Sequence, residues 1–389
     1  MRYDQLVPQG TYIHKYMKSM HALETPFAYD FWCAIWTIGA ACGRNVCVNR
    51  PRSPVRLNWF VVLAADSGST RKSTAVSVAS KLVARLNIPV ISTERRLKQL
   101  LSEPALEEVS IAVGELSRVM GKQASMKDVP DLIIDMYDSD TPLSPFGSFI
   151  SASTPGRLVS LVNPVVVESG FASRVLFVVA DRPKRPVSWP SGDEETEIAL
   201  LASALTECVN ADDTDKIGMN AKALKRYDSW YKHRLKHFDS FRASFEARED
   251  DHVLRLAACL CINDGTWEIQ LSHIRTAVRI IADTKETMHV LLSGDQTAST
   301  RITAGVDRMR KKLVAAGSDG LQHRDLYLAI RTRLNIDEYR TLIKIMHECD
   351  LIQVFETLKG RTRLYRATGK LLEFGSTASI ISRLSQFKG

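Results

Sequence analysis

Residues 59–79 read WFVVLAADSGSTRKSTAVSVA, and this stretch decides the fold. Its first part, Trp59 to Leu63, is apolar and has the length and residue types of a buried strand. A small, polar segment follows at 65–71, and Lys72-Ser73-Thr74 then opens a helical pattern. The order strand, tight loop, Lys-Ser/Thr, helix is the context that a phosphate-binding loop requires.

In such a loop, backbone N–H groups and the positive end of the helix dipole bind phosphate oxygens. Lys72 would reach the β- and γ-phosphates, and the Ser73 hydroxyl would bind Mg²⁺. The pattern G-x-x-x-x-G-K-[ST] has glycine where this chain has Asp66 and Arg71. A chance Lys-Ser-Thr at a helix start, where serine is a good cap, is the alternative interpretation. The predicted nucleotide contacts along this segment are Ser67, Gly68, Ser69, Thr70, Arg71, Lys72, Ser73 and Thr74.

Size and charge limit the class of protein. A chain of 389 residues is long enough for two or three domains, and its hydrophobic content of 45% is ordinary for a soluble globular protein. No apolar run approaches the roughly 20 residues of a membrane helix, and the first ten residues lack the order of a signal peptide. Seven cysteines without zinc spacing predict free thiols in a reducing cytoplasm.

The positive charge is concentrated near the C-terminus. Residues 301–389 hold 17 Lys and Arg against 9 Asp and Glu, whereas residues 1–300 hold 35 of each kind. This asymmetry predicts that the C-terminal segment binds a polyanion, most simply nucleic acid.

Strand and helix patterns alternate between residues 59 and 182. This alternation predicts an α/β layer with a mainly parallel sheet, whose ligands bind beyond the carboxyl ends of the strands. Residues 1–58 predict a helical N-terminal region with helices over 11–20 and 27–42. After a Pro-rich linker that ends the core at residue 190, residues 191–298 predict a helical lid domain. The strand patterns lie at 59–64, 89–92, 109–113, 146–152 and 175–180.

Polar residues follow two of these strands. Glu115 comes after 109–113 and would orient or deprotonate an attacking water, although a carboxylate at a helix N-terminus is also favoured by the dipole. Ser153 and Thr154 follow the strand pattern at 146–152, and one of the two, Ser153 or Thr154, would sense the γ-phosphate. A helix cap, with Pro155 at the first helical position, explains the same segment.

Two arginines are candidate phosphate contacts. Arg174 lies on a short turn before strand 175–180, where it would reach a neighbour's nucleotide as an arginine finger. The alternative is a structural arginine that pairs with an acid of its own subunit. Arg255 stands early on the apolar helix 252–262. A buried arginine needs an anionic partner, and a bound phosphate is one candidate. In the helix expected over 221–248, the aromatic spacing predicts core packing rather than a base-stacking platform.

Residues 299–370 predict a winged helix. Helix signals at 301–316, 323–333 and 337–349 precede a hairpin pattern with basic residues at its tip. Such residues commonly lie on phosphates, although winged helices also serve as protein contacts. Residues 371–389 predict a loose tail. The predicted DNA contacts are Arg340, Lys344, Lys359, Arg361 and Arg363.

The order of these features over residues 8–295 resembles the P-loop ATPase module of phage- and plasmid-type primase–helicases and related mobile-element ATPases. The resemblance rests on the residues at 8–10, 39–44, 58–63, 67–74, 114–117, 153–155, 170–174 and 252–262. Members of this family commonly have Gly where Ala65 stands here and often Asp where Gly114 stands.

The resemblance implies a P-loop NTPase core of the RecA/AAA+-like kind over 59–190, with ATP and Mg²⁺ as cofactors. It implies that Lys72 and Ser73 bind the phosphates and the metal, that Glu115 acts on water, and that Arg174 acts across a subunit boundary. Ring assembly, commonly hexameric, and movement along single-stranded DNA are also implied. Because no primase domain fits into residues 1–58, any priming would come from a separate primase.

Three functions are compatible with this sequence. The first is an ATP-dependent DNA helicase or translocase of a mobile element or phage, acting in DNA replication as a ring oligomer. The second is a non-helicase DNA-binding ATPase, such as a replication initiator, a helicase loader or a defence-system switch. The third is a nucleotide-free scaffold that binds DNA. DNA-stimulated ATP turnover with strand displacement distinguishes the first from the others.

Overall fold

The computed structural model describes residues 3–66, 68, 70–93, 95–97, 99, 108–120, 129–138, 145–161, 170–180, 183–210, 216–234, 245–292, 308–330, 336–348, 350–356 and 363–368. The chain divides into two compact units, Met1–Ser293 and Gly294–Gly389. The predicted contacts Ser67, Ser69, Lys359 and Arg361 and the predicted tail lie outside the described residues. Among the described helices, none is both long and apolar enough to span a membrane.

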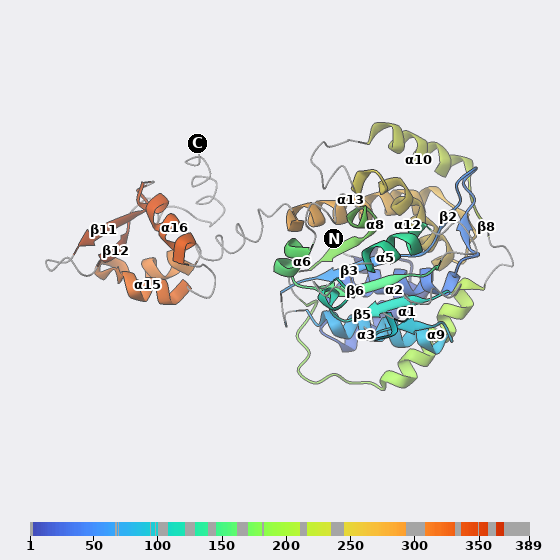
Figure 1. The fold of residues 1–389 in the computed structure, drawn as a ribbon, viewed down its shortest axis with the longest axis horizontal. Coiled ribbons are helices and arrows are strands. Elements are labelled where there is room, and N and C mark those ends of the chain that lie inside the picture. Colours follow the sequence, from blue (N-terminus) through green and yellow to red (C-terminus); the bar gives the residue numbers. More distant parts are fainter. Residues whose placement is uncertain are drawn as a thin grey trace. The chain divides into compact units, whose positions relative to one another are not determined.

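A five-stranded parallel sheet forms the centre of the first unit (Figure 1). All five predicted strands are confirmed, and every neighbouring pair runs parallel. The strand order is β4-β5-β6-β3-β7, which places β6 between β3 and β5. The strands are β3 (Phe60–Ala64), β4 (Val90–Ile91), β5 (Ser110–Val113), β6 (Phe149–Ser153) and β7 (Leu176–Val179).

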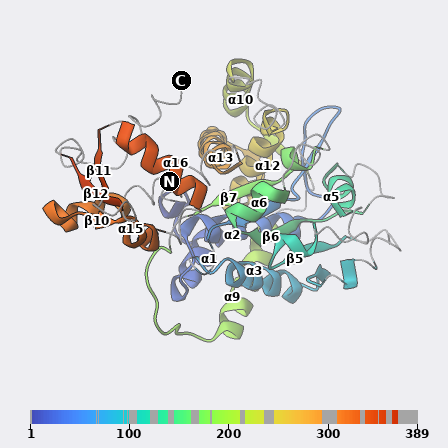
Figure 2. The same cartoon turned by 60° about the vertical axis from the view of Figure 1, so that its left-hand side comes forward.

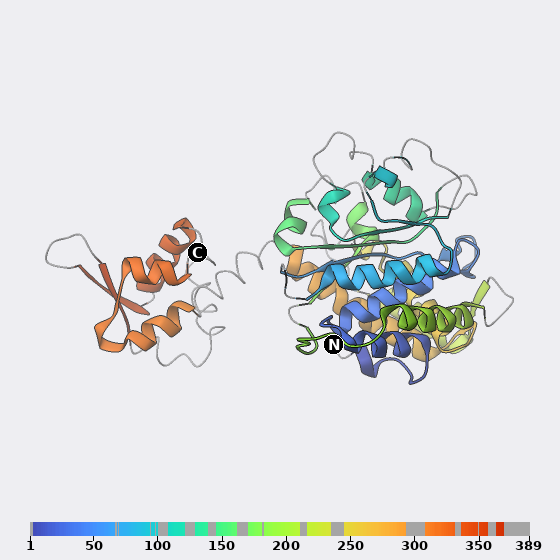
Figure 3. The same ribbon diagram turned by 90° about the horizontal axis from the view of Figure 1, so that it is seen from below.

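Helices cover both faces of this sheet. Helices α2 (Phe27–Cys42) and α3 (Lys72–Arg85) pack together on one side, and α5 (Val129–Asp138) lies on the other (Figure 3). All five residues of β3 are buried. A strand covered on both faces reads as a continuous apolar run rather than an alternating one, which explains the sequence of β3.

The other helices of the first unit surround this layer. The helices predicted over 11–20 and 27–42 are confirmed as α1 and α2. The helix predicted over 221–248 is wrong in length, because α10 ends at His233 and Arg234 has an extended backbone. The remaining elements are η1 (Tyr3–Gln5), α1 (Tyr12–Ser19), η2 (Met20–Ala22), η3 (Leu116–Arg118), α6 (Pro155–Leu161), α8 (Phe171–Arg174), α9 (Glu194–Val209), α10 (Ala221–His233), α12 (Glu249–Asn263) and α13 (Leu271–Leu292).

A second, smaller sheet joins parts of the chain that the sequence indicated to be helical. Its order is β2-β1-β8-β9, so the N-terminal region and the lid region share one sheet. Most of these strands have only two residues, which is too short for a period-2 pattern to show in the sequence. The strands are β1 (Cys47–Val48), β2 (Val55–Arg56), β8 (Lys216–Met219) and β9 (Glu268–Ile269).

A buried ion pair links Lys184, in the segment after β7, to the N-terminal helices. Lys184 Nζ lies 2.5 Å from Asp30 Oδ2, and both side chains are almost fully buried. Thr25 Oγ1 donates to the other carboxylate oxygen over 2.6 Å, and Lys184 also donates to the carbonyl of Met20. Burial raises the pKa of Asp30 to about 7, and the Lys184 charge opposes that rise.

The second unit has its own apolar core and a three-stranded antiparallel sheet of order β10-β12-β11 (Figure 2). The predicted hairpin is confirmed as β11 and β12, whereas the third strand, β10, was not predicted. Residues 308–316 are helical. The other elements are η5 (Gly317–Asp319), β10 (Leu321–Gln322), α15 (His323–Ile330), α16 (Ile336–Glu348), β11 (Ile352–Glu356) and β12 (Arg363–Ala367).

Candidate functional site

The predicted phosphate loop joins β3 to α3 at the carboxyl edge of the parallel sheet. Lys72, the first residue of α3, is 9% exposed. Its Nζ donates to the carbonyls of Ala65 and Asp66 over 2.8 and 2.9 Å, so the ammonium group lies against the loop backbone. Burial lowers the pKa of Lys72, and the carboxylates of Glu115 and Asp66 oppose this shift. The loop therefore holds a cation whose charge is poorly solvated and would be stabilised by an anion.

The loop has left-handed backbone at two of its described positions. Gly68 has φ of +77°, and Arg71, which precedes the helix, has φ of +49° and ψ of +38°. Glycine adopts this region at little cost, whereas an arginine there is strained. The Arg71 side chain points to the N-terminal region, where its Nε donates to Glu24 over 2.9 Å. Glu24 also accepts from the backbone N–H of Val187, and these two bonds lower its pKa.

Ser73 faces the end of β5. Its Oγ lies 3.5 Å from the carbonyl oxygen of Gly114. A Cβ added at Gly114 would come to 3.9 Å from Ser73 Cβ and 4.0 Å from Ser73 Oγ, which are ordinary contacts. Gly114 is therefore adjacent to the predicted metal ligand, and there is room for a side chain there.

Glu115 and Ser153, predicted from two different strands, come into contact. Ser153 Oγ donates to Glu115 Oε1 over 3.3 Å, because β5 and β6 are neighbours and end side by side. Arg157, in the first turn of α6, places its Nη1 3.3 Å from Glu115 Oε2. The Glu115 side chain makes no capping hydrogen bond to η3. Arg157 was missed by the sequence analysis, because only the strand order reveals that α6 begins beside Glu115.

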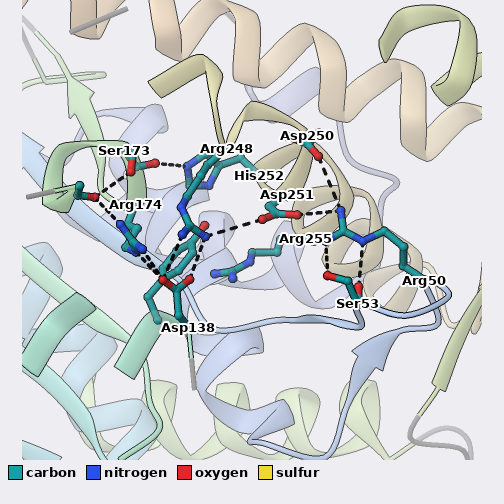
Figure 4. Close-up of polar contacts among 12 residues, drawn as sticks. Arg50, Ser53, Asp138, Ser173, Arg174, Arg248, Asp250, Asp251, His252 and Arg255 are labelled. Carbon is teal, nitrogen blue, oxygen red and sulfur yellow. Dashed lines mark hydrogen bonds and ion pairs between the residues drawn. The ribbon is translucent and has the colours of Figure 1, made fainter. Parts of the chain in front are cut away.

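Arg174, drawn with its polar contacts in Figure 4, lies at the opposite end of the strands from the phosphate loop. It ends α8, just before β7, whose first residue Leu176 pairs with Val61 near the amino end of β3. Its Nε donates to Asp138 Oδ2 over 3.0 Å, its Nη2 also contacts that oxygen, and its Nη1 donates to the carbonyl of Gly170. The pairing with an acid of the same chain is thus present in this structure.

Arg255 does not join the phosphate loop of its own chain, and its contact with a bound phosphate stays a prediction. It is 4% exposed, and its Nη1 donates to the carbonyl of Asn58 over 2.6 Å. Asn58 precedes β3 and Ala65 follows it, and the seven residue steps between them span about 23 Å of extended chain. The guanidinium instead stacks on the ring of Tyr137, with Cζ 3.8 Å from the ring centroid.

Three predicted DNA contacts come together in the second unit. Arg340 and Lys344 on α16 and Arg363 on β12 line one cavity of about 550 Å³. His323 and His347 line it too, and no acidic residue is found among the described residues of its lining. Burial lowers the pKa of His323, and the Arg363 and Arg340 charges add to that effect.

The aromatic residues of α10 do not form core as predicted. Ala223 is the one buried residue of this helix, and Tyr231 is 44% exposed. Tyr227 and Trp230 are half-buried and pack against the first unit's core. The helical spacing of aromatic residues indicated a packed stripe correctly but overestimated its burial.

Comparisons with known proteins give only distant structural likenesses. No family model matches the chain, and no curated protein matches it. Among solved structures, a full-length MCM homolog from Methanopyrus kandleri is similar, with 13% sequence identity and a TM-score of 0.42. The match covers 73% of this chain and 59% of that chain, so it spans less than two thirds of the other protein.

Proposed function

We propose that this protein is an ATP-dependent DNA helicase or translocase, which acts in the DNA replication of a mobile element or phage as a ring of identical subunits. The proposal is carried by the meeting of Lys72, Ser73, Glu115 and Ser153 at the carboxyl edge of one parallel sheet. Parallel α/β sheets bind ligands at that edge, and these residue types are the ones that phosphoryl transfer from ATP requires.

Each of these side chains has a role in the proposed reaction. Lys72 exchanges its two carbonyl partners for oxygens of the β- and γ-phosphates, which its poorly solvated charge favours. Glu115 orients the attacking water and accepts its proton, while Ser153 and Arg157 hold the carboxylate in place. Loop N–H groups and the N-terminus of α3 bind the remaining phosphate oxygens.

The residues present fit a Mg²⁺ ion that is held largely by the nucleotide and by water. Ser73 Oγ and the Glu115 carboxylate are oxygen donors on the same side of the loop, and Mg²⁺ prefers oxygen ligands and retains several waters. A bound Mg²⁺ would neutralise charge on the β- and γ-phosphates. Ser73 is the protein ligand that we assign to it.

A ring is supported by the position of Arg174. Because Leu176 pairs with Val61, Arg174 lies level with Trp59, six residue steps or about 20 Å of extended chain before Ala65 of its own phosphate loop. It would therefore act on the nucleotide of a neighbouring subunit. The second unit is proposed to be a winged helix, and the basic cavity lined by Arg340, Lys344 and Arg363 is proposed to bind DNA phosphates.

A DNA-binding ATPase that does not unwind DNA is the second candidate, and two observations favour it. Gly114 brings no carboxylate to the metal side of the loop, and the Glu115 carboxylate is already paired with Arg157. Both features favour nucleotide binding over rapid turnover. In this candidate function, ATP would control assembly on DNA rather than drive movement.

The test is ATP hydrolysis and strand displacement with and without single-stranded DNA, for the wild type, Lys72→Ala and Glu115→Gln. We expect turnover that DNA stimulates in the wild type, loss of ATP binding in Lys72→Ala, and binding without turnover in Glu115→Gln. Turnover in Lys72→Ala equal to that of the wild type contradicts the proposed site. DNA-stimulated turnover without strand displacement selects the second candidate.

A further inference from the structure

Three guanidinium groups surround one aromatic ring at the amino edge of the parallel sheet (Figure 4). The Cζ atoms of Arg174, Arg248 and Arg255 lie 5.8, 5.5 and 3.8 Å from the centroid of the Tyr137 ring. Arg174 ends α8, Arg248 immediately precedes α12, and Arg255 lies within α12. Three like charges at this distance repel one another, so the arrangement requires anions nearby.

One carboxylate, Asp138, joins two of the three arginines. Arg248 donates to both of its oxygens, from Nη1 over 2.8 Å and from Nη2 over 3.0 Å. Arg174 contacts Oδ2 through its Nε and Nη2. Both guanidinium groups thus bind the same carboxylate. Arginine side chains bind phosphoryl oxygens with the same geometry. The Asp138 side chain is 38% exposed, so this anion position is accessible from solvent.

Within the part of the chain that the structure describes, the ion-pair network around Asp138 has more positive than negative charge. It connects four arginines, Arg50, Arg174, Arg234 and Arg248, with three aspartates, Asp138, Asp250 and Asp251.

Arg255 adds a further charge beside this network. Among the described residues it has no carboxylate within ion-pair distance, and its Nε has no hydrogen-bond partner. Counted over the described residues alone, these five arginines and three aspartates leave an excess of two positive charges, and Arg255 is 96% buried. A further anion would therefore be stabilised here.

We propose that Asp138 occupies the anion position of a second phosphoryl-binding site, in which Arg174 and Arg248 bind the terminal phosphoryl group of a nucleotide held by a second copy of this chain. The proposal rests on the proposed function. Asp138 acts as an internal competitor that keeps both arginines paired until a neighbour's nucleotide replaces it. Arg248 is a phosphoryl ligand alongside Arg174, and Arg255 supplies a buried positive charge behind Tyr137.

The position of the arginine cluster requires that the nucleotide be held by a second copy of the chain. The cluster lies at the amino edge of the sheet and the phosphate loop at the carboxyl edge, so a nucleotide on the chain's own loop is out of reach. A terminal phosphoryl group is favoured over a carboxylate because it offers three oxygens and a larger charge to the two forks. A free pyrophosphate offers the same chemistry, and the experiment has separate arms for the two sources.

The first arm measures binding of inorganic pyrophosphate to the full chain by calorimetry. All variants carry Lys72→Ala, which disables the phosphate loop. Adding Asp138→Asn should strengthen pyrophosphate binding at least tenfold, because the competing charge is gone and the shape is kept. A third change, Arg248→Met, should abolish this gain. Equal affinity with and without Asp138→Asn overturns the proposal. This arm measures anion binding at the arginine cluster and does not depend on ATP hydrolysis. If the wild type hydrolyses no ATP, the proposed function fails, but this arm still tests the second phosphoryl-binding site.

The second arm tests the neighbour. Arg248→Met subunits keep an intact phosphate loop, whereas Lys72→Ala subunits keep intact arginines. Neither should hydrolyse ATP alone, and mixing them should restore part of the wild-type turnover. No restoration at any ratio, with pyrophosphate binding intact, overturns the assignment to a second copy.

Should Asp138→Asn not fold, Arg248→Lys serves instead, because it keeps the charge but loses the guanidinium fork. Arg248→Lys should bind ATP normally and hydrolyse it at least tenfold more slowly than the wild type. Wild-type turnover in Arg248→Lys overturns the role of Arg248.

Discussion

Ser153 Oγ donates a hydrogen bond to the carboxylate of Glu115 over 3.3 Å, and this contact joins the ends of two neighbouring strands. Ser153 is the last residue of β6, and Glu115 comes two residues after β5. Arg157 approaches the other carboxylate oxygen from the opposite side, so the carboxylate is held by a hydroxyl and a guanidinium. The geometry of the proposed base therefore depends on the strand order β5-β6-β3, which also brings the phosphate loop beside it.

Ser153→Ala should slow turnover without weakening ATP binding. A hydrogen bond to a charged group contributes about 1.5 kcal/mol, which corresponds to about a tenfold loss in kcat if the bond orients the base in the transition state. ATP affinity should stay within about twofold of the wild type by that argument. Single-turnover hydrolysis and equilibrium nucleotide binding measure the two quantities.

Ser151→Ala is the matched control for that change. Ser151 lies on the same strand, is buried, and donates to the carbonyl of Val113 over 2.8 Å. Its loss should cost about 1 kcal/mol of stability and leave the turnover of the folded protein unchanged. Equal turnover in Ser153→Ala and Ser151→Ala contradicts a positioning role for Ser153.

Gly114→Asp should increase the affinity for Mg²⁺-ATP. The added Cβ would lie 4.0 Å from Ser73 Oγ without a clash, so the carboxylate would enter the surroundings of the predicted metal ligand. An added oxygen ligand of opposite charge should lower the Mg²⁺ concentration that half-saturates ATP binding by about fivefold or more. A Mg²⁺ titration of nucleotide binding measures this, with Gly114→Asn as the uncharged control. An unchanged or higher requirement for Mg²⁺ in Gly114→Asp places the metal elsewhere.

The sequence predicted the parallel sheet and the residues at its carboxyl edge because long, continuous apolar strands and their polar ends are local signals. The apolar run at Phe60–Ala64 and the following Lys72 are examples. What the sequence could not supply was the pairing of distant elements. The contact of Arg157 with Glu115 depends on strand order, and the stacking of Arg255 on Tyr137 depends on how α12 packs against α5. Both contacts join residues more than forty positions apart in the chain.

The strands of the second sheet were missed for a different reason. Strands such as Cys47–Val48 and Glu268–Ile269 contain two residues, so they show neither alternation nor a continuous apolar run. Burial was also misjudged at α10, where Tyr227 and Trp230 pack inward but Tyr231 remains at the surface. Spacing identifies the side of a helix that packs, but it does not tell how deeply the helix is covered.

Arg71→Gly should be more stable than Arg71→Ala. Both changes remove the exposed ion pair with Glu24, which contributes at most about 1 kcal/mol. Alanine retains the left-handed strain at φ of +49°, whereas glycine removes it. A non-glycine residue in this region costs about 1–2 kcal/mol, from which the greater chain entropy of unfolded glycine subtracts about 0.5–1 kcal/mol.

The expected difference is therefore about 0.5–1 kcal/mol in favour of Arg71→Gly, measured by denaturant unfolding. Nucleotide binding should survive in both variants if Arg71 serves the loop through its backbone. Equal stability of the two variants means that the loop relaxes out of the left-handed conformation when the arginine is removed.

Lys184→Met should destabilise the first unit, and more strongly at higher pH. Breaking a buried ion pair by removing one partner costs about 3–5 kcal/mol, because Asp30 is left buried without its cation. Burial already raises the folded-state pKa of Asp30 above its ordinary value, and the loss of the Lys184 charge removes the interaction that lowers it. A carboxyl group with a raised folded-state pKa favours folding below its unfolded-state pKa, and this contribution is lost as pH rises through the folded-state pKa.

The stability difference between Lys184→Met and the wild type should therefore stay nearly constant from pH 5 to about pH 7, where Asp30 is protonated in both folded proteins. It should grow from pH 7 to pH 8, as measured by urea unfolding at each pH. Adding Asp30→Asn removes the buried charge, so it should recover much of the loss and flatten the pH dependence. A difference that stays constant or shrinks from pH 7 to pH 8 would mean that loss of Lys184 does not raise the folded-state pKa of Asp30.

Lys344→Ala and Arg363→Ala should each weaken DNA binding and reduce its salt dependence. Both side chains line the basic cavity of the second unit, together with Arg340. Each phosphate contact contributes about 0.9 to the slope of log K against log salt for duplex DNA and about 0.7 for single strands. The slope of log K against log salt, measured between 50 and 200 mM salt, should thus decrease by about the contribution of one phosphate contact per substitution. The sequence preference should not change.

Lys312→Ala is the control, because Lys312 is an exposed lysine of the same unit that does not line the cavity. It removes the same net charge, so it should lower affinity only slightly and leave the salt slope almost unchanged. If Lys312→Ala and Lys344→Ala lower the slope equally, the DNA responds to the overall charge of the unit rather than to the cavity. If neither cavity substitution changes the slope, DNA binds elsewhere, and the cavity has no part in the proposed function.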